Sequence, residues 1–217
     1  MGGAAAKGCA PGPVGHEEML LWRRGCRLLA GADEAGRGPL AGPVVAAAVM
    51  LRADWPDPGV DDSKRLSAAR REFLAERIKA DAAGWAVAVV EADEIDRLNI
   101  HNASLLAMSR AVEQLRPRPD FLLVDGRFVT PLDLPQKAVV GGDASCRCIA
   151  AASILAKVWR DGLMARLHER WPQYNFAANK GYPTPQHKEA LARFGPCPIH
   201  RRSYADVAQM PLAWGDA

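Results

Sequence analysis

Two apolar runs joined by a glycine-rich connection constrain the fold of this chain more than any other feature. Residues 27–32 and 43–51 have the length and composition of buried strands. The connection between them, residues 36–42, contains three glycines and a proline. Because glycine accepts backbone angles that other residues avoid, such a connection can reverse the chain tightly. The segment therefore predicts a β-hairpin of two buried strands.

The rest of the chain alternates between segments of helical and of strand-like periodicity. Helices are expected at residues 67–82, 93–99, 102–115, 145–170 and 185–194, and further strands at 85–90, 121–124 and 137–140. Asp143 or Ser145 is placed to cap the longest helix. A helix between two strands implies a crossover connection, with the strand at 121–124 parallel to its neighbour. This order predicts an α/β fold with a mixed sheet.

Composition argues against several classes of protein. No apolar stretch approaches the roughly 18 residues that suggest a membrane-spanning helix, so we expect no membrane contact. Residues 2–13 lack the basic, apolar and cleavage segments of a secretory signal, and we therefore expect a cytoplasmic protein. The five cysteines do not stand at zinc spacing, and we interpret them as free thiols.

The charge of the chain is unevenly distributed. The formal net charge is only +3, but residues 157–202 hold nine Lys and Arg against three Asp and Glu, an excess of six positive charges. A basic region of this kind suits a polyanionic partner, although a solvated helix face would give the same count.

Four acidic residues stand at the ends of predicted elements. Asp33 and Glu34 lie where a buried strand meets the glycine-rich turn, and Asp125 ends the apolar run at 121–124. An acid at the carboxyl end of a strand sits at the edge where α/β folds bind their ligands. Asp143 precedes the longest helix. The alternatives are an acidic surface turn for the first pair and a helix cap for Asp143.

Acids on separate elements without a histidine cluster are typical of hard-cation chemistry. All-oxygen sites prefer Mg²⁺ or Mn²⁺ over zinc. Two such ions can activate a water and stabilise the leaving oxygen when a phosphodiester is hydrolysed. We therefore expect Asp33, Glu34, Asp125 and Asp143 to bind Mg²⁺ or Mn²⁺ and to be catalytic.

Candidate phosphate-binding residues follow the acidic pair. Gly36 and Gly38 would let backbone N–H groups approach a phosphate or a sugar, and Arg37 supplies charge. The alternative is that these glycines serve only the hairpin turn. Lys64 is a further candidate, although this segment also fits a helix start with Ser63 or Ser67 as the cap.

Taken together, seven motifs resemble bacterial ribonuclease HII. They are GADEAGRGPLAGPV at 31–44, DSKRLS at 62–67, LVDG at 123–126, GD at 142–143, IAAASILAKV at 149–158, NKGYPT at 179–184 and HRRS at 200–203. They occur in the right order, and several are long enough that coincidence is a poor explanation.

The resemblance implies a ribonuclease H-like mixed sheet flanked by helices, with a small C-terminal helical subdomain. It implies hydrolysis of the phosphodiester 5′ of ribonucleotides, in RNA–DNA hybrids and in duplex DNA, giving 3′-hydroxyl and 5′-phosphate ends. The four acids match the family's metal-binding carboxylates. Residues 36–38 match the family's segment that recognises the 2′-hydroxyl at the RNA–DNA junction. Tyr182 matches the residue that stacks on the sugar after the ribonucleotide. A packed aromatic is the alternative for Tyr182.

With this resemblance, the chain is expected to divide into four parts. They are a flexible tail at 1–18, a ribonuclease H-like catalytic domain at 19–160, a C-terminal helical subdomain at 161–207 and a tail at 208–217. The first residues are rich in Gly, Ala and Pro, so they cannot bury enough apolar area to offset their ordering entropy. His200, Arg201 and Ser203 also match the family, but a structural hydrogen-bonding role suffices for them.

Two other functions remain open on the sequence. A junction resolvase or integrase on the same fold would share the four acids but would not need residues 36–38 together with Tyr182. An inactive binding module for hybrid duplexes would not need all four acids.

The last residues suggest a protein partner. The segment Gln209-Met-Pro-Leu-Ala-Trp214 resembles a bacterial sliding-clamp-binding peptide, in which a few anchors supply most of the affinity. Gln209 would meet a polar rim, while Leu212 and Trp214 would fill apolar pockets. The alternative is that these side chains pack back onto the domain.

Overall fold

A mixed five-stranded sheet forms the centre of the protein in this computed structural model, which describes residues 15–209. Its strands are β1 (Leu29–Ala35), β2 (Val44–Leu51), β3 (Gly84–Val90), β4 (Phe121–Asp125) and β5 (Gln136–Val139). They lie in the order β3-β2-β1-β4-β5. The β1–β2 and β2–β3 pairs are antiparallel, whereas β4 runs parallel to both β1 and β5. The predicted hairpin and mixed sheet are confirmed.

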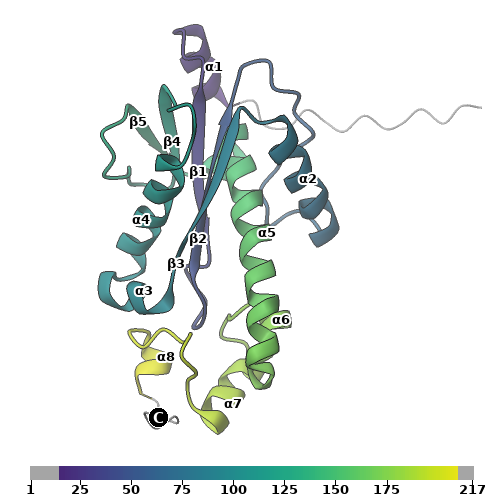
Figure 1. Ribbon diagram of the computed structural model, residues 1–217, viewed down its shortest axis with the longest axis vertical. Coiled ribbons are helices and arrows are strands. Elements are labelled where there is room, and N and C mark those ends of the chain that lie inside the picture. The colour runs from purple at the N-terminus through teal and green to yellow at the C-terminus, as the bar shows by residue number, and fades with distance from the viewer. Residues whose placement is uncertain (1–14, 210–217) are drawn as a thin grey trace, which may run out of the picture.

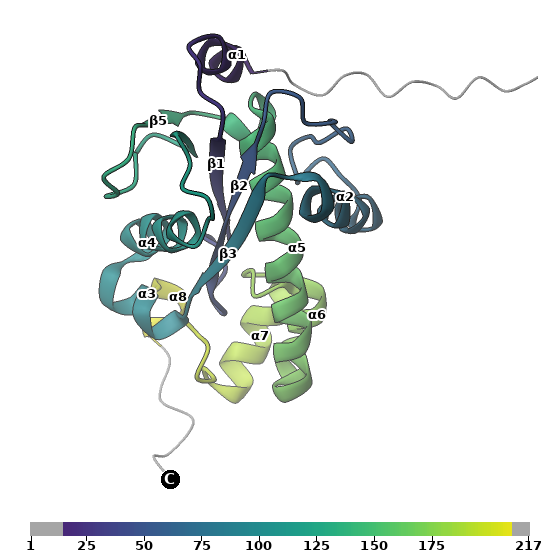
Figure 2. The same ribbon diagram turned by 45° about the horizontal axis from the view of Figure 1, so that its top comes forward.

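Helices cover both faces of this sheet (Figures 1 and 2). The α-helices of the described residues are α1 (His16–Arg23), α2 (Ala68–Asp81), α3 (Ala92–Leu98), α4 (Ile100–Glu113), α5 (Arg147–Arg170), α6 (Phe176–Asn179), α7 (Pro185–Phe194) and α8 (Ala205–Ala208). Helices α2 and α5 pack on one face, and α3 and α4 on the other. The α/β class is therefore confirmed, with helix bounds within a few residues of those expected.

The pleat of the central strand assigns its side chains to the two layers. Leu29 of β1 belongs to the core on the α5 side, while Ala30 and Ala32 belong to the core on the α4 side. Successive side chains of a strand point to opposite faces. Because both faces are covered, β1 and β2 read as nearly continuous apolar runs rather than as alternating patterns.

Gly31 allows α5 to lie directly on β1. A Cβ atom added at Gly31 would stand 2.3 Å from the carbonyl carbon of Cys148 and 2.4 Å from the nitrogen of Ile149. Contacts this short do not occur, so no side chain fits between strand and helix here. The first turn of α5 is thereby placed over the middle of β1.

The start of α5 is capped by a residue far away in the chain. The side chain of Glu18, fully buried in α1, accepts hydrogen bonds from the backbone nitrogens of Arg147 (3.0 Å) and Cys148 (2.9 Å). A carboxylate at a helix N-terminus satisfies free N–H groups and interacts favourably with the helix dipole. The expected cap by Asp143 or Ser145 is wrong, because α5 begins after Cys146.

The same contact moves the expected start of the ordered chain. Helix α1 begins at His16, ahead of the expected boundary at residue 19, because Glu18 is held by α5. The division of the chain into domains otherwise stays a prediction. Four cysteines (Cys26, Cys146, Cys148 and Cys197) are free thiols, as expected, and Cys9 lies outside the described residues.

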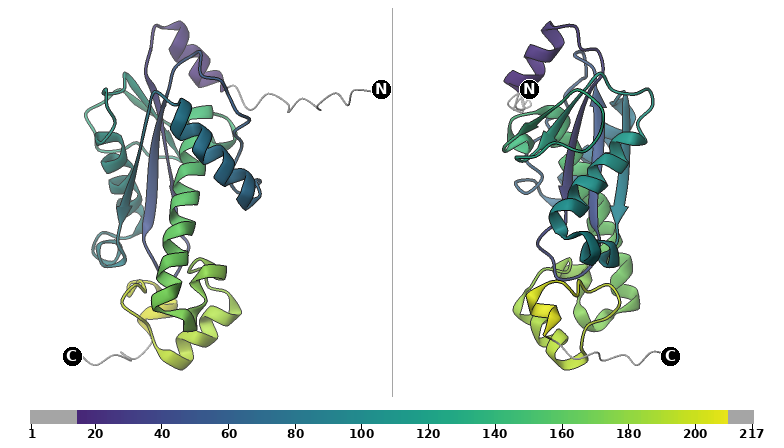
Figure 3. Two further views of the ribbon diagram at one scale, coloured as in Figure 1. Left: turned by 45° about the vertical axis from the view of Figure 1, so that its right-hand side comes forward. Right: turned by 90° about the vertical axis from the view of Figure 1, so that its left-hand side faces the viewer.

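Helix α5 continues beyond the sheet and carries the C-terminal helices at its far end (Figure 3). There Met164 of α5 packs with Tyr174, Phe176 and Cys197, and with Ala41 from the connection between β1 and β2. This second small core ties the hairpin loop to the C-terminal region. Within residues 15–209, none of the helices combines the length and hydropathy needed to cross a membrane.

Candidate functional site

Three of the predicted acids meet at one edge of the sheet. Parallel strand pairing brings Asp33 and Asp125 there, and the turn that follows β5 brings Asp143. Ala32 of β1 pairs with Val124 of β4, so that Asp33 and Asp125 follow at the same level. Asp125 in turn pairs with Val139 at the end of β5. The chain then turns back toward the site, since the backbone nitrogen of Gly142 donates to Asp125 Oδ1 at 2.7 Å. That bond holds the turn that carries Asp143.

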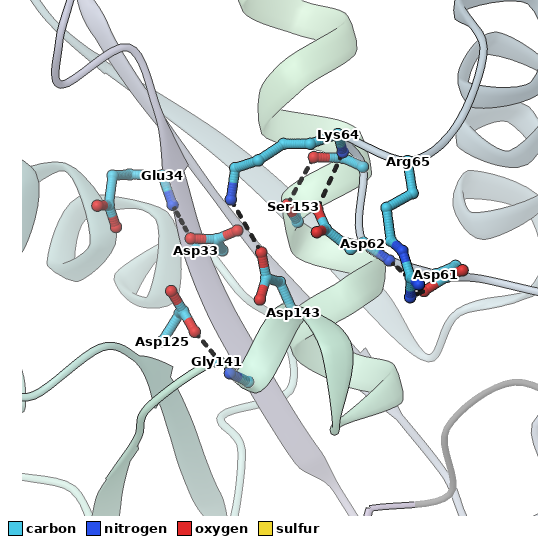
Figure 4. A network of polar contacts seen from close by, with 12 residues as sticks. Asp33, Glu34, Asp61, Asp62, Lys64, Arg65, Asp125, Gly141, Asp143 and Ser153 are labelled. Carbon is cyan, nitrogen blue, oxygen red and sulfur yellow. Dashed lines mark hydrogen bonds and ion pairs between the residues drawn. The ribbon is translucent and has the colours of Figure 1, made fainter.

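The side chains of Asp33, Asp125 and Asp143 face one common space in Figure 4. Asp33 and Asp125 continue the α5-facing rows of their strands, which contain Leu29 and Leu123. Glu34, the next residue on β1, belongs by alternation to the α4 side, and its side chain extends away from the other three. The four acids therefore approach the site from both sides of β1.

Burial makes these carboxylates expensive in the absence of a cation. Asp33 is only 5% exposed, and burial together with the charges of Glu34 and Asp125 raises its pKa well above the usual value. Burial and the charge of Asp143 likewise raise the pKa of Asp125. Across residues 15–209, no Lys, Arg or His forms an ion pair with Asp33 or Asp125. The oxygen donors of Asp33 and Asp125 thus face the site without an ion-pair partner among the described residues.

Two basic side chains neutralise the remaining acids. Lys64 Nζ lies 3.1 Å from Asp143 Oδ2, and Arg37 Nη1 lies 3.1 Å from Glu34 Oε1. Burial lowers the pKa of Lys64, but the bond to Asp143 and the nearby acids outweigh it, so the pKa is raised. Burial raises the pKa of Glu34, and the charge of Arg37 opposes that effect. The ammonium group of Lys64 and the guanidinium group of Arg37 thus each pair with one acid at the rim of the site.

A cavity of about 260 Å³ opens beside these acids. It is lined by Asp33, Glu34, Ala35, Gly36, Arg37, Gly38, Ser63, Lys64, Asp125, Ser153, Lys157, Arg160 and Tyr182. All of the predicted site residues line it except Asp143, which reaches it through its bond to Lys64. The structure thus brings together every site residue predicted from the sequence.

Residues 36–43, here called the reading loop, are held by two buried arginines. Arg201 donates to the carbonyls of Gly36 (2.6 Å), Arg37 (2.9 Å) and Gly42 (3.0 Å). Arg160 donates to the carbonyls of Pro43 (3.0 Å) and Ala41 (3.3 Å). Both guanidinium groups are at most 1% exposed. Because the two arginines bind five of its carbonyls, the reading loop is held as one unit beside the cavity.

Tyr182 lies against this loop with its ring accessible. The side chain is 43% exposed, and its Cε1 atom would lie 3.5 Å from a Cβ atom added at Gly38. The backbone nitrogen of Leu40 donates to the Gly181 carbonyl at 2.8 Å, which joins the two segments. The alternative of a packed core aromatic is therefore wrong for Tyr182. A flat ring at the cavity rim is free to stack on a ligand.

Several cavity residues were missed by sequence reasoning. Arg160 and Lys157 were counted only as part of a basic region, and Ser153 was considered only as part of a motif. Ser63 and Ser153 share a hydrogen bond of 2.9 Å between their Oγ atoms. The polar spacing of residues 153, 157 and 160 along α5 was the one available signal, since they share a helix face.

The donor set fits a hard divalent cation, although no ligand cluster is preformed. Among the described residues, no three His, Cys, Asp or Glu side chains converge as closely as metal ligands do. The buried carboxylate of Asp33 and the half-buried one of Asp125 nevertheless supply the oxygen donors such a cation requires. Lys64 and Arg37 now hold the other two acids, so binding would require those side chains to turn.

Comparison with known sequences gives a consistent match. A model of the family described as Ribonuclease HII matches residues 30–207. Ribonuclease HII of Anaeromyxobacter sp. (strain Fw109-5) is 55% identical over 88% of this chain, which spans only 61% of that relative. Ribonuclease HII of Idiomarina loihiensis is 55% identical over 84% of this chain and 98% of its own length.

Solved structures agree with the sequence matches. Ribonuclease H2 from Pyrococcus horikoshii superposes with a TM-score of 0.73 at 28% identity, covering 84% of this chain and 96% of that one. Ribonuclease HII from Archaeoglobus fulgidus, solved in a complex with PCNA, gives a TM-score of 0.69 at 30% identity, covering 80% and 93%. The expected ribonuclease H-like fold is confirmed.

We expect the metal-free Asp33→Asn variant to melt a few degrees above the parent protein near neutral pH. Burial and neighbouring carboxylates raise the pKa of Asp33, so its charged form costs folding free energy above that raised pKa. In a chain of this size, each kcal/mol moves the melting temperature by about 2–4 °C. The gain should shrink as the pH falls, because the parent then protonates Asp33 in the folded state. Thermal melts in chelator at several pH values measure both effects.

Asp54→Asn is the matched control, since the Asp54 side chain is 83% exposed and the change should leave the melting temperature unaltered. A melting temperature of Asp33→Asn below that of the parent near neutral pH would contradict this account of the site.

Proposed function

Because the chain belongs to the ribonuclease HII family, we propose that it is a divalent-metal-dependent endoribonuclease acting on RNA–DNA hybrids and on ribonucleotides embedded in duplex DNA. Cleavage would fall on the 5′ side of a ribonucleotide and leave a 3′-hydroxyl and a 5′-phosphate. The observation that carries the proposal is the meeting of four acids and the reading loop at one cavity. We expect it to act in the cytoplasm.

Asp33, Glu34, Asp125 and Asp143 would hold Mg²⁺ or Mn²⁺ in this proposal. Two such ions supply the activation of water and the stabilisation of the leaving oxygen. Asp33 and Asp125 present fixed negative charge from neighbouring strands, because their strands are paired in register. Lys64, released from Asp143, is placed to contact a phosphate beside the cavity. The position of the acids at the sheet edge supports this assignment.

The reading loop would distinguish ribonucleotides from deoxyribonucleotides. Arg201 binds the carbonyls of Gly36 and Arg37, and both of these residues line the cavity. Gly38 lines the cavity without a side chain that would keep a sugar from Tyr182, whereas the missing side chain of Gly36 makes room for Arg160, whose Nε would lie 2.1 Å from an added Cβ. Polar groups placed for a 2′-hydroxyl are left unpaired when that hydroxyl is missing, which penalises plain DNA.

Tyr182 would place the sugar that follows the ribonucleotide. Its exposed ring stands beside Gly38, so a sugar stacked on the ring would lie next to the reading loop. Junction resolvases and integrases need the acids but do not need the Tyr182 ring beside the reading loop. A binding module would need the pairing but not the acids. A nuclease specific for ribonucleotides uses both, which is why it is preferred.

We expect each amide variant of the four acids, Asp33→Asn, Glu34→Gln, Asp125→Asn and Asp143→Asn, to lower turnover by orders of magnitude. Each change removes charge from the proposed metal site and little volume, so the fold should persist. The measurement is cleavage of a duplex with one embedded ribonucleotide, with and without Mg²⁺ or Mn²⁺. An all-DNA duplex of the same sequence is the substrate control. Cleavage by Asp125→Asn at the parent rate would refute the metal assignment.

We expect Tyr182→Ala to lower kcat/KM on a single embedded ribonucleotide by an amount equivalent to about 1–3 kcal/mol, the usual contribution of aromatic stacking. Tyr182→Phe keeps the ring and should stay close to the parent. Equal activities of all three proteins on that duplex would remove Tyr182 from the substrate-binding residues.

We also propose a sliding clamp as a partner through Gln209, Leu212 and Trp214. Gln209 is exposed at the end of the described chain, while Leu212 and Trp214 lie outside the described residues. The Archaeoglobus fulgidus relative, solved in a complex with PCNA, supports this proposal. Such a contact would bring the enzyme to newly made DNA.

We expect the parent to bind a purified bacterial clamp and the double variant Leu212→Ala/Trp214→Ala to lose that binding, because two anchors supply most of a peptide's affinity. Met210→Ala retains all three proposed anchors and serves as the control in surface plasmon resonance. The absence of a clamp signal from the parent would end the proposal.

A further inference from the structure

Three successive backbone carbonyls around Tyr182 are held by three different parts of the molecule. Arg160 Nη1 donates to the Lys180 carbonyl at 3.0 Å, and the Leu40 nitrogen donates to the Gly181 carbonyl at 2.8 Å. The Tyr182 carbonyl accepts from the Thr184 nitrogen at 2.8 Å and lies 2.8 Å from His187 Nδ1. The backbone that carries the exposed ring is therefore fixed on every side.

His187 continues into a chain of buried polar groups that the proposed chemistry does not use. Its Nε2 atom lies 3.1 Å from Nε2 of His200. Nδ1 of His200 lies 3.0 Å from the backbone nitrogen and 3.1 Å from Sγ of Cys197. Both imidazoles are at most 1% exposed, and the rings of Tyr174 and Phe176 pack against them.

The partners at the two ends determine where the protons lie. The Tyr182 carbonyl can only accept, so His187 must carry a proton on Nδ1. The Cys197 nitrogen can only donate, so His200 must leave Nδ1 bare and carry its proton on Nε2. The Cys197 carbonyl, 3.3 Å from the same Nδ1, then makes no hydrogen bond to it. His200 therefore donates to His187, and His187 donates to Tyr182.

This arrangement requires both rings to be neutral. A second proton on His187 would put two N–H groups opposite each other between the Nε2 atoms. A second proton on His200 would sit on Nδ1 and face the N–H group of Cys197. The surroundings disfavour it, because burial lowers the pKa of both histidines, with the neighbouring His187 and Arg202 also lowering that of His200 to about 3. The geometry and the burial thus agree on one pattern of protons.

We propose that His187 and His200 form a neutral, directional hydrogen-bond relay that positions Tyr182 against the reading loop. His187 is then a positioning residue for recognition of the sugar next to the ribonucleotide, and His200 sets its tautomer. The relay runs from the C-terminal region, at Cys197, to the backbone of the residue whose ring faces the cavity. The proposal rests on the proposed substrate-binding role of Tyr182.

Two substitutions of His187 separate the two ends of the relay. In His187→Asn, the side-chain amide can occupy the place of Nδ1 and still donate to the Tyr182 carbonyl. In His187→Gln, the amide reaches the place of Nε2 and leaves that carbonyl without its side-chain donor. Both variants remove one imidazole and add one amide, so each is the control for the other.

We expect His187→Gln to lower kcat/KM on a single embedded ribonucleotide by about tenfold, the effect of one lost hydrogen bond. His187→Asn should stay within about threefold of the parent. Because the relay acts through Tyr182, adding His187→Gln to Tyr182→Ala should cause no further loss. Equal activities of the Asn and Gln variants would overturn the proposal, as would a full additional loss in the Tyr182→Ala background.

Nuclear magnetic resonance of the full-length parent, labelled with ¹⁵N-histidine, tests the relay without any substitution. We expect the proton of His187 on Nδ1 and that of His200 on Nε2 near neutral pH. The opposite tautomer of either ring, or a charged ring, would overturn the relay. This readout is independent of cleavage, so a parent protein without ribonuclease activity would refute the proposed function and leave the relay to be judged by its tautomers.

Discussion

Two buried guanidinium groups hold the reading loop in place, and the half of the site proposed to recognise substrate depends on them. Arg160 and Arg201 are nearly inaccessible, and within the described residues neither pairs with a carboxylate. Leaving a buried charge unpaired is costly, so backbone carbonyls of residues 36–43 and of Lys180 take the place of the missing acid. Any displacement of the loop would expose both charges to apolar surroundings. The loop is therefore rigid for electrostatic reasons, not because of its own sequence.

The half of the site proposed to be catalytic follows the opposite principle. Asp33 and Asp125 crowd together at the sheet edge because parallel pairing of β1 and β4 leaves them no other place. Their mutual repulsion is balanced only in part by Lys64 and Arg37, which pair with the other two acids. Because neighbouring carboxylates repel one another in the empty site, a bound cation would stabilise this part of the protein. One side of the cavity is thus built around buried positive charge and the other around unbalanced negative charge.

Features that depend on a short stretch of sequence could be predicted from the sequence alone. Strand ends followed by an acid located Asp33 and Asp125, whereas the role of Tyr182 came from the family resemblance and stays a prediction. Groups whose partners are distant could not be found this way. Arg201 binds Gly36 across 165 residues, and Glu18 caps α5 across 130. The wrong cap assignment arose because a helix N-terminus was searched for a partner nearby, whereas in this fold the partner comes from another helix.

The Glu18 cap also has a consequence for the order in which the protein assembles. Closing a loop of 130 residues costs more chain entropy than local contacts do, and this contact must wait until residues 147 and 148 have been synthesised. The turn that bears Asp143 immediately precedes the capped end of α5. We therefore expect the β1–β2–β3 meander and its helices to consolidate early, while the turn that carries Asp143 becomes ordered late. During synthesis on the ribosome, a nascent chain would then carry no complete nuclease site until most of its length had emerged.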